Sequence, residues 1–386
     1  MDKHTKKTPS LFQYPVLVAF GLFFIGLFVL DMATPDRAYS ELENTTLTQR
    51  PRLTAVSADG LNNYFTSYTR YVKDQVFGRD QWISLQSAAE TTLFQKTQSG
   101  GILLGREHMM FARHYSILKN EEKGMAKNLA AVQSLAQRYP GRVNLMLVPS
   151  ASVVYPENVP AGAPQIDEKG ILEGVAAQGE AYGRFIDVLP TLTEHKEEYL
   201  YYRTDHHWTS LGAYYGYTAL MEAMGMEPVD LADYERTTVT DQFYGTIFSA
   251  SGVRWVAPDR IDTYIPADGV KVTSYFDGTP SQGSLYVDSY LEVKDKYSYF
   301  LGGVQPLCVV ETGLTDAPRL LLIRDSYSDS LTPFLTQSFS QIHLFDPRYN
   351  LSSIQGYIQD NGIDAVAVLY SIPNYIADEY QFVLSR

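Results

Sequence analysis

The stretch LLLIRDSY at residues 320–327 decides the fold class of this chain. Its first four residues are apolar, as in a strand that is buried on both faces of a sheet. The residues after them are polar, and a helical pattern begins at Ser328. A strand that runs into a turn and then a helix places Ser326 at the carboxyl edge of a sheet, where α/β proteins carry their active sites.

Short apolar runs of the same kind lie at 143–148, 185–189, 342–345 and 365–369. Residues with helical spacing lie between several of these runs, as at 125–139 and 351–361. Short strands that alternate with helices predict a parallel α/β sheet. Residues 226–300 break this alternation because they are rich in Tyr, Asp, Gly and Pro, and we expect an irregular or β-rich insertion there.

The stretch RTDHHWT at residues 203–209 offers a carboxylate and two imidazoles within three positions. Because residues i and i+2 of an extended segment point the same way, Asp205 and His207 can face one cleft. An aspartate beside an imidazole fixes its tautomer and stabilises the imidazolium that forms during proton transfer. With Ser326 these two residues would complete a set of nucleophile, base and orienting carboxylate. His206 would then point elsewhere, towards packing or the substrate rim.

Each of these motifs, taken alone, also has a structural interpretation. Asp205 could cap the helix that follows it, and Asp325-Ser326 at a strand end commonly caps a helix as well. An aspartate and two histidines are also metal ligands. No third, separated ligand group accompanies them, because His195 and His343 are isolated. The sequence therefore predicts neither a metal ion nor a dissociable cofactor.

The segment 11–30 contains no charged residue and is long enough to cross a hydrocarbon layer of about 30 Å as a helix. Lysines precede it and acidic residues follow it, which favours a cytoplasmic N-terminus. A cleaved signal peptide is the competing interpretation, but the run exceeds the usual signal core and no A-x-A site follows it. We expect a cytoplasmic tail at 1–10, an uncleaved single-pass anchor in the cell membrane at 11–32, a stalk at 33–62 and an extracytoplasmic domain at 63–386.

Composition narrows the possible partners. The 386 residues carry a formal charge of −13, which argues against nucleic acid and against an anionic polymer gripped over a broad surface. Cys308 is the single cysteine, so the outer domain has no internal disulfide and must be held together by packing alone.

The tetrapeptide DHHW at 205–208, with DSY downstream at 325–327, resembles the motif of the bacterial DHHW proteins. These are related to the alginate O-acetylation proteins, whose matching motif is D-x-H-W, and belong to the SGNH hydrolase-like group. Supporting resemblances lie at 34–37, 40–44, 74–75, 79–82, 243–246 and 300–303. The resemblance covers most of the outer domain. It implies an SGNH hydrolase-like parallel-sheet α/β/α sandwich, with the insertion at 226–300 and one transmembrane helix before it.

Carried over position by position, the resemblance implies Ser326 as nucleophile, His207 as general base and Asp205 as its orienting residue. The site departs from the pattern of its relatives in two places, at Arg324 and Val304.

Arg324 replaces the usual glycine before Asp-Ser, and Val304 stands where relatives often carry an asparagine. The oxyanion donors would then be backbone N–H groups of Ser326 and Gly303. Arg324, His206 and Trp208 are further candidates for contact with substrate, although we expect Trp208 to pack and seat the histidine loop.

The function that the resemblance implies is an outward-facing O-acyltransferase acting on a cell-surface or secreted polysaccharide, with acetyl as the expected acyl group. A multipass membrane-bound O-acyltransferase would supply the acyl group, and the anchor would hold the domain beside it. Two other functions stay open. One is a polysaccharide esterase with the same triad, in which water is the acceptor. The other is a non-catalytic carbohydrate-binding scaffold of an export or modification complex.

Overall fold

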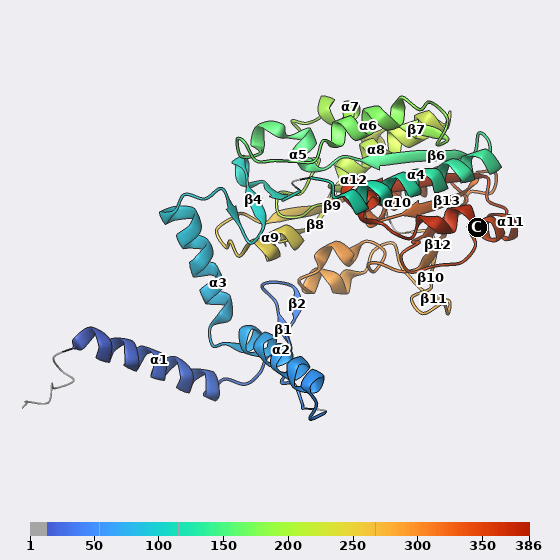
Figure 1. Cartoon of the computed structure of the whole chain (residues 1–386). Coiled ribbons are helices and arrows are strands. Elements are labelled where there is room, and N and C mark those ends of the chain that lie inside the picture. The colour runs from blue at the N-terminus through green and yellow to red at the C-terminus, as the bar shows by residue number, and fades with distance from the viewer. Residues whose placement is uncertain (1–13, 54, 115, 267) are drawn as a thin grey trace, which may run out of the picture. The chain divides into compact units, whose positions relative to one another are not determined.

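The computed structural model describes residues 14–53, 55–114, 116–266 and 268–386. The chain divides into two compact units, Met1–Ala89 and Glu90–Arg386 (Figure 1). The boundary at residues 62 and 63, predicted between stalk and outer domain, falls inside a helix of the first unit. The second unit contains the large sheet and both sequence motifs.

The first unit is made of helices and one short strand pair. In chain order its elements are α1 (Pro15–Ala33), β1 (Tyr39–Ser40), β2 (Thr45–Thr46), α2 (Ala58–Gln75) and α3 (Arg79–Ala88). Among the described residues, α1 is the helix that is long and apolar enough to cross a membrane, and none of its residues is buried. It agrees with the described part of the predicted anchor. The predicted tail at 1–10 and residues 11–13 of the anchor lie outside the described residues.

The second unit is built on an eight-stranded sheet in the order β11-β10-β12-β14-β13-β15-β6-β7. Its strands are β6 (Val143–Val148), β7 (Arg184–Ile186), β10 (Lys271–Ser274), β11 (Ser281–Gln282), β12 (Leu307–Glu311), β13 (Arg319–Arg324), β14 (Gln341–Phe345) and β15 (Ala365–Ser371). The strands from β14 to β7 pair in parallel, which confirms the predicted parallel sheet. At the other edge β12, β10 and β11 continue the sheet antiparallel. The segment 226–300, predicted as an insertion, therefore supplies two edge strands of the main sheet.

Helices cover both faces of this sheet (Figure 1). Successive side chains of a strand point to opposite faces, and the apolar run of β13 follows this rule. Leu320 and Leu322 pack into the core beneath α8 and α10, whereas Leu321 and Ile323 pack with α4, α6, α11 and α12. These helices are α4 (Lys119–Arg138), α6 (Glu168–Ala176), α8 (Ser210–Ala223), α10 (Tyr327–Leu335), α11 (Ile354–Asp360) and α12 (Ile372–Ala377). The architecture is the predicted α/β/α sandwich.

Shorter elements complete the unit. They are β3 (Gln98–Ser99), β4 (Ile102–Leu104), β5 (Met110–Ala112), α5 (Ala151–Val154), α7 (Leu189–Glu194), β8 (Thr237–Phe243), α9 (Thr246–Ser251) and β9 (Asp259–Thr263). Because β6, β13 and β15 are parallel, their carboxyl ends lie at one edge of the sheet. The residues that follow these three strands therefore come close together there.

Candidate active site

The turn that carries Ser326 joins β13 to α10 and is held by its own aspartate. Asp325 accepts hydrogen bonds from the backbone N–H of Tyr327 at 3.0 Å, from the N–H and hydroxyl of Ser371, both at 2.9 Å, and from the side-chain amide of Asn374 at 2.8 Å. Two of these residues follow or end β15, the neighbour of β13 in the sheet. Asp325 thus fixes the position of the turn through these hydrogen bonds.

The histidine loop is seated by Trp208, whose side chain is fully buried. The indole N–H donates to the carbonyl of Tyr327 at 2.8 Å, and Gly216 on α8 lets the ring approach the helix where a Cβ would collide with it. Thr209 caps α8 by accepting a hydrogen bond from the N–H of Gly212 at 3.2 Å. Trp208 therefore packs, as expected, and does not offer a surface to substrate.

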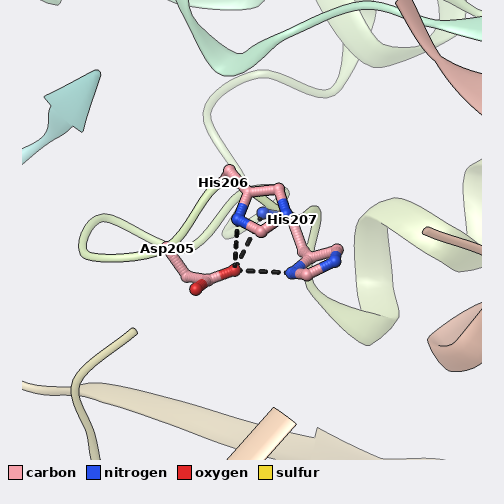
Figure 2. Close-up of side chains that lie close together, drawn as sticks. All are labelled: Asp205, His206 and His207. Carbon is pink, nitrogen blue, oxygen red and sulfur yellow. Dashed lines mark hydrogen bonds and ion pairs between the residues drawn. The ribbon is translucent and has the colours of Figure 1, made fainter. Parts of the chain in front are cut away.

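These two segments bring a carboxylate, an imidazole and a hydroxyl into one hydrogen-bonded chain. His207 Nδ1 lies 2.6 Å from Asp205 Oδ1, and His207 Nε2 lies 2.8 Å from Ser326 Oγ. With Nδ1–H donated to the carboxylate, Nε2 is the acceptor for the serine hydroxyl. Figure 2 shows both imidazoles converging on the same oxygen of Asp205. The arrangement is that of a nucleophile, a base and an orienting carboxylate.

The carboxylate of Asp205 is buried but well supplied with donors. Its Oδ2 accepts from the backbone N–H of Thr246 at 2.8 Å and from the Thr246 hydroxyl at 3.0 Å. Burial opposes ionisation, but the imidazoles of His206 and His207 and these hydrogen bonds hold the pKa of Asp205 well below its usual range. Gly245 lies against Asp205 where any Cβ would collide with the carboxylate, so the approach requires glycine.

Tyr297 contacts both His207 and Ser326. Its ring stacks on His207 with centroids 3.7 Å apart and planes 8° from parallel. Its hydroxyl donates to the carbonyl of Ser326 at 3.0 Å and lies 3.2 Å from Ser330 Oγ. Sequence reasoning missed Tyr297 and Thr246 because both lie in the segment 226–300, remote in sequence from the residues that they contact. The resemblance at 243–246 was the one signal that pointed to Thr246.

The two candidate oxyanion donors, the N–H groups of Ser326 and Gly303, differ in whether they already donate a hydrogen bond. The N–H of Ser326 lies at the start of α10, and no acceptor in the described part of the chain takes a hydrogen bond from it. Backbone N–H groups at a helix N-terminus are suited to binding an oxyanion. The N–H of Gly303 instead donates to the carbonyl of Phe300 at 3.3 Å. The donor predicted at Gly303 is therefore already engaged, and Val304 beside it is 43% exposed.

Arg324 does not reach the site that its sequence position suggested. Its side chain is fully buried and forms an ion pair with Asp329. As the last residue of β13 it shares the face of Leu322, so strand alternation directs it into the helical layer and away from the cavity beside Ser326. Burial raises the pKa of Asp329 to about 7, and the guanidinium opposes this shift. The sequence made Arg324 a candidate for contact with substrate, but its side chain is buried against Asp329 and is not free to make that contact.

A cavity of about 370 Å³ lies beside the hydrogen-bonded chain. Its polar wall includes Asp205, His206, Thr246, Tyr327 and Asn374. Its apolar wall includes Ile102, Met110, Phe111, Ile247 and Ala250. The cavity is therefore next to the turn of Ser326, and His206 lies in its wall.

Asp205, His206 and His207 also form a possible metal site, because one donor atom of each lies within 4.8 Å of the others. A metal ligated at about 2.0–2.2 Å would replace the hydrogen bond between Asp205 and His207. It would thereby remove the arrangement that makes His207 a base for Ser326. The donors that are present fit acid–base chemistry better than metal binding.

The sequence profile of the DHHW protein family matches residues 129–345, more than half of the chain. The "Probable alginate O-acetylase AlgJ" of Pseudomonas syringae pv. tomato is 27% identical over 136 residues, which are 34% of this chain and 34% of that protein. The chain thus aligns with about a third of the length of this curated relative.

Solved structures share the fold. The crystal structure of a DHHW family protein from Eubacterium siraeum is 24% identical, with a TM-score of 0.63 over 74% of this chain and 95% of that one. PatB1 of Bacillus cereus, solved with a sulfonyl adduct, is 21% identical, with a TM-score of 0.61 over 73% of this chain and 99% of that one. At these identities the likeness concerns the fold, which is the predicted α/β/α sandwich.

Proposed function

The chain belongs to the DHHW protein family, and on that premise we propose that it is an O-acyltransferase that carries an acetyl group on Ser326 and passes it to a hydroxyl of a polysaccharide. The observation that carries the proposal is the hydrogen-bonded chain from Asp205 through His207 to Ser326. Support for acetyl and for a polysaccharide comes from the relative in Pseudomonas syringae, a probable alginate O-acetylase.

The first half of the proposed reaction loads the enzyme. Ser326 Oγ attacks the carbonyl carbon of the acyl donor while its proton moves to His207 Nε2. The Asp205 carboxylate stabilises the imidazolium that results. The free N–H of Ser326 donates to the oxyanion of the tetrahedral intermediate. Collapse of this intermediate expels the leaving group, which takes the proton from His207, and an acetyl ester remains on Ser326.

The second half unloads the enzyme. A sugar hydroxyl attacks the ester carbonyl and gives its proton to His207. The new tetrahedral intermediate collapses, Ser326 Oγ leaves and recovers that proton from His207. The products are an acetylated sugar and the free serine. If water attacks in place of the sugar, the same steps release acetate, so the transferase depends on a bound acceptor.

The proposed cellular setting follows from α1. It acts as a single-pass membrane anchor, and the unit that carries Ser326 is extracytoplasmic. A membrane-bound O-acyltransferase is the partner that presents the acyl group. The apolar helix and the lysines before it support this setting.

The test uses the full chain in detergent. A sulfonyl fluoride probe should label the wild type at Ser326 and fail to label Ser326→Ala, as read by mass spectrometry of the tryptic peptide. Incubation with 4-nitrophenyl acetate should place acetyl on the same residue. If Ser326→Ala and His207→Ala both fold and still support full acetylation of the polymer in cells, the chain is a scaffold and the proposal is wrong.

A further inference from the structure

His206 has a settled protonation state in the wall of the 370 Å³ cavity. The Asp205 carboxylate accepts hydrogen bonds only, so the Thr246 hydroxyl, 3.0 Å from Oδ2, must donate to it. The Thr246 oxygen, 2.9 Å from His206 Nδ1, is then the acceptor for an Nδ1–H. Desolvation in the cavity wall and the neighbouring imidazole of His207 lower the pKa of His206, which favours the neutral ring that these hydrogen bonds describe.

This tautomer leaves His206 Nε2 without a proton. No group in the described part of the chain donates a hydrogen bond to that nitrogen. The side chain lines the cavity and keeps 38% of its surface exposed. The ring therefore offers a bare acceptor that only a hydrogen-bond donor can satisfy.

The two substrates of an acyltransferase differ in whether they can donate a hydrogen bond to His206 Nε2. An acetyl ester or thioester presents oxygens that accept hydrogen bonds and has no donor of its own, whereas a sugar presents hydroxyl donors. The lining of the cavity also includes apolar side chains such as Phe111 and Ile247, which suit the C–H face of a sugar ring. The volume also falls within the range of about 300–1,000 Å³ that is usual for ligand sites.

We propose that this cavity binds the acceptor sugar and that His206 Nε2 accepts a hydrogen bond from one of its hydroxyls. The inference rests on the proposed function and adds the residue that selects and orients the acceptor. The hydroxyl bound to His206 is not the one that reacts, because the reacting proton goes to His207. The ring centroids of His206 and His207 are 3.9 Å apart, and His207 contacts Ser326. A sugar that is held by one hydroxyl at His206 would therefore present another hydroxyl to the ester on Ser326.

The experiment measures how the acyl-enzyme divides between transfer and hydrolysis. The full chain in detergent is loaded with 4-nitrophenyl acetate in the presence of cellotetraose, chitotetraose or an alginate tetrasaccharide. Acetylated sugar and free acetate are both quantified by mass spectrometry. Because both products come from one acyl-enzyme, their ratio does not depend on how fast that ester forms.

His206→Phe keeps a flat ring and removes the acceptor, and it should lower the ratio of transfer to hydrolysis by about threefold to tenfold, the worth of one neutral hydrogen bond. His206→Gln, whose amide oxygen can stand near the position of Nε2, should recover part of the loss. Nitrogen NMR of histidine-labelled protein should also show His206 Nε2 without a proton.

The outcomes separate the inference from the function beneath it. An unchanged ratio in His206→Phe, or a protonated Nε2 near pH 7, overturns the inference and leaves the acyltransferase intact. Acetate as the sole product with all three sugars overturns the inference together with transfer, and indicates an esterase. Failure to acylate Ser326 at all overturns the proposed function itself.

Discussion

The turn at residues 324–327 and the segment 226–300 both reach the candidate active site, but they are held there in different ways. The turn is fixed from the sheet, by hydrogen bonds between Asp325 and the end of β15. The segment brings Thr246 and Tyr297, which contact Asp205 and His207 through hydrogen bonds and ring stacking. In the proposed mechanism the sheet end thus supplies the nucleophile, and the segment orients the residues that activate it.

The largest effect should come from Asp205, the carboxylate that the segment holds beside His207. Asp205→Asn keeps the shape of the side chain but loses the negative charge that stabilises the imidazolium. We expect the rate of Ser326 acylation by 4-nitrophenyl acetate to fall by about 10³–10⁴-fold. Asp241→Asn removes the same charge at an exposed position of the segment and should leave the rate unchanged. A loss below tenfold in Asp205→Asn would show that the carboxylate is structural.

Glu168, a second buried carboxylate, tests how the sheet end is held without involving the segment 226–300. Glu168 accepts hydrogen bonds from the N–H and hydroxyl of Ser150, which follows β6 and lines the cavity. Burial raises the pKa of Glu168 to about 7. In the unfolded chain its pKa is near the ordinary value of about 4.3, so ionisation favours unfolding as the pH rises between these values. The free energy of unfolding should therefore fall by about 3 kcal/mol between about pH 4 and pH 7, and level off above.

Glu168→Gln should lack this fall, as measured by urea unfolding of the full chain in detergent at several pH values. Glu173→Gln, an exposed glutamate on the same helix, is the matched control and should keep the slope of the wild type. Parallel curves for wild type and Glu168→Gln would contradict the assignment of the pH dependence to this carboxyl group.

Tyr297 tests the support that the segment gives to the base. Tyr297→Leu removes both the stacked ring and the hydroxyl and should lower the acylation rate by about tenfold, because the imidazole of His207 loses the ring that fixes its plane. Tyr297→Phe keeps the ring, and its acylation rate should lie between those of the wild type and Tyr297→Leu. The NMR signal of the His207 Nδ1 proton should persist in the Phe variant and broaden in the Leu variant.

Tyr299→Leu serves as the control for that series. Tyr299 is buried in the same short helix, Lys296–Tyr299, and stacks on Tyr286 at 5.1 Å between centroids, away from His207. Tyr299→Leu should lower the free energy of unfolding without slowing acylation of Ser326. Equal rates in the two Leu variants would mean that Tyr297 acts through folding only.

The smallest effect should come from the hydrogen bond that the Thr246 hydroxyl donates to Asp205. Thr246→Val removes the hydroxyl but keeps the backbone N–H that also donates to Oδ2. The acylation rate should fall by about threefold to tenfold, the worth of one hydrogen bond to a carboxylate that keeps its other donors. Thr246→Ser retains the hydroxyl and should recover most of the rate, measured by nitrophenolate release. A larger loss in the Ser variant than in the Val variant would assign the effect to packing of the methyl group.

The sequence predicts the parts of the site that are local and misses those that depend on long-range packing. Asp205 and His207 are two positions apart, and Ser326 follows an apolar strand, so spacing and burial pattern were sufficient to single them out. Tyr297 and Thr246 carry no such pattern, and their contacts arise only when the segment folds over the loop. Arg324 was assigned by adjacency to Ser326, but strand alternation buries it.

The same distinction applies to the fold. The central strands were predictable because they are apolar on both faces, as at residues 143–148 and 365–371. The strands β10 and β11 have four and two residues, too few for a pattern to be recognised in the sequence. β10 pairs with β12 and β11 pairs with β10, so their place in the sheet depends on these partner strands.

The tie between Asp325 and β15 has a consequence for biogenesis. Ser326 lies 119 residues after His207, and its turn is fixed by Ser371 and Asn374, later still in the chain. A nascent chain that ends at Ser326 therefore has the serine but lacks the residues that order its turn. Contacts between residues far apart in sequence require loop closure and slow folding. The turn of Ser326 can be ordered only after β15 has been synthesised and has paired with β13.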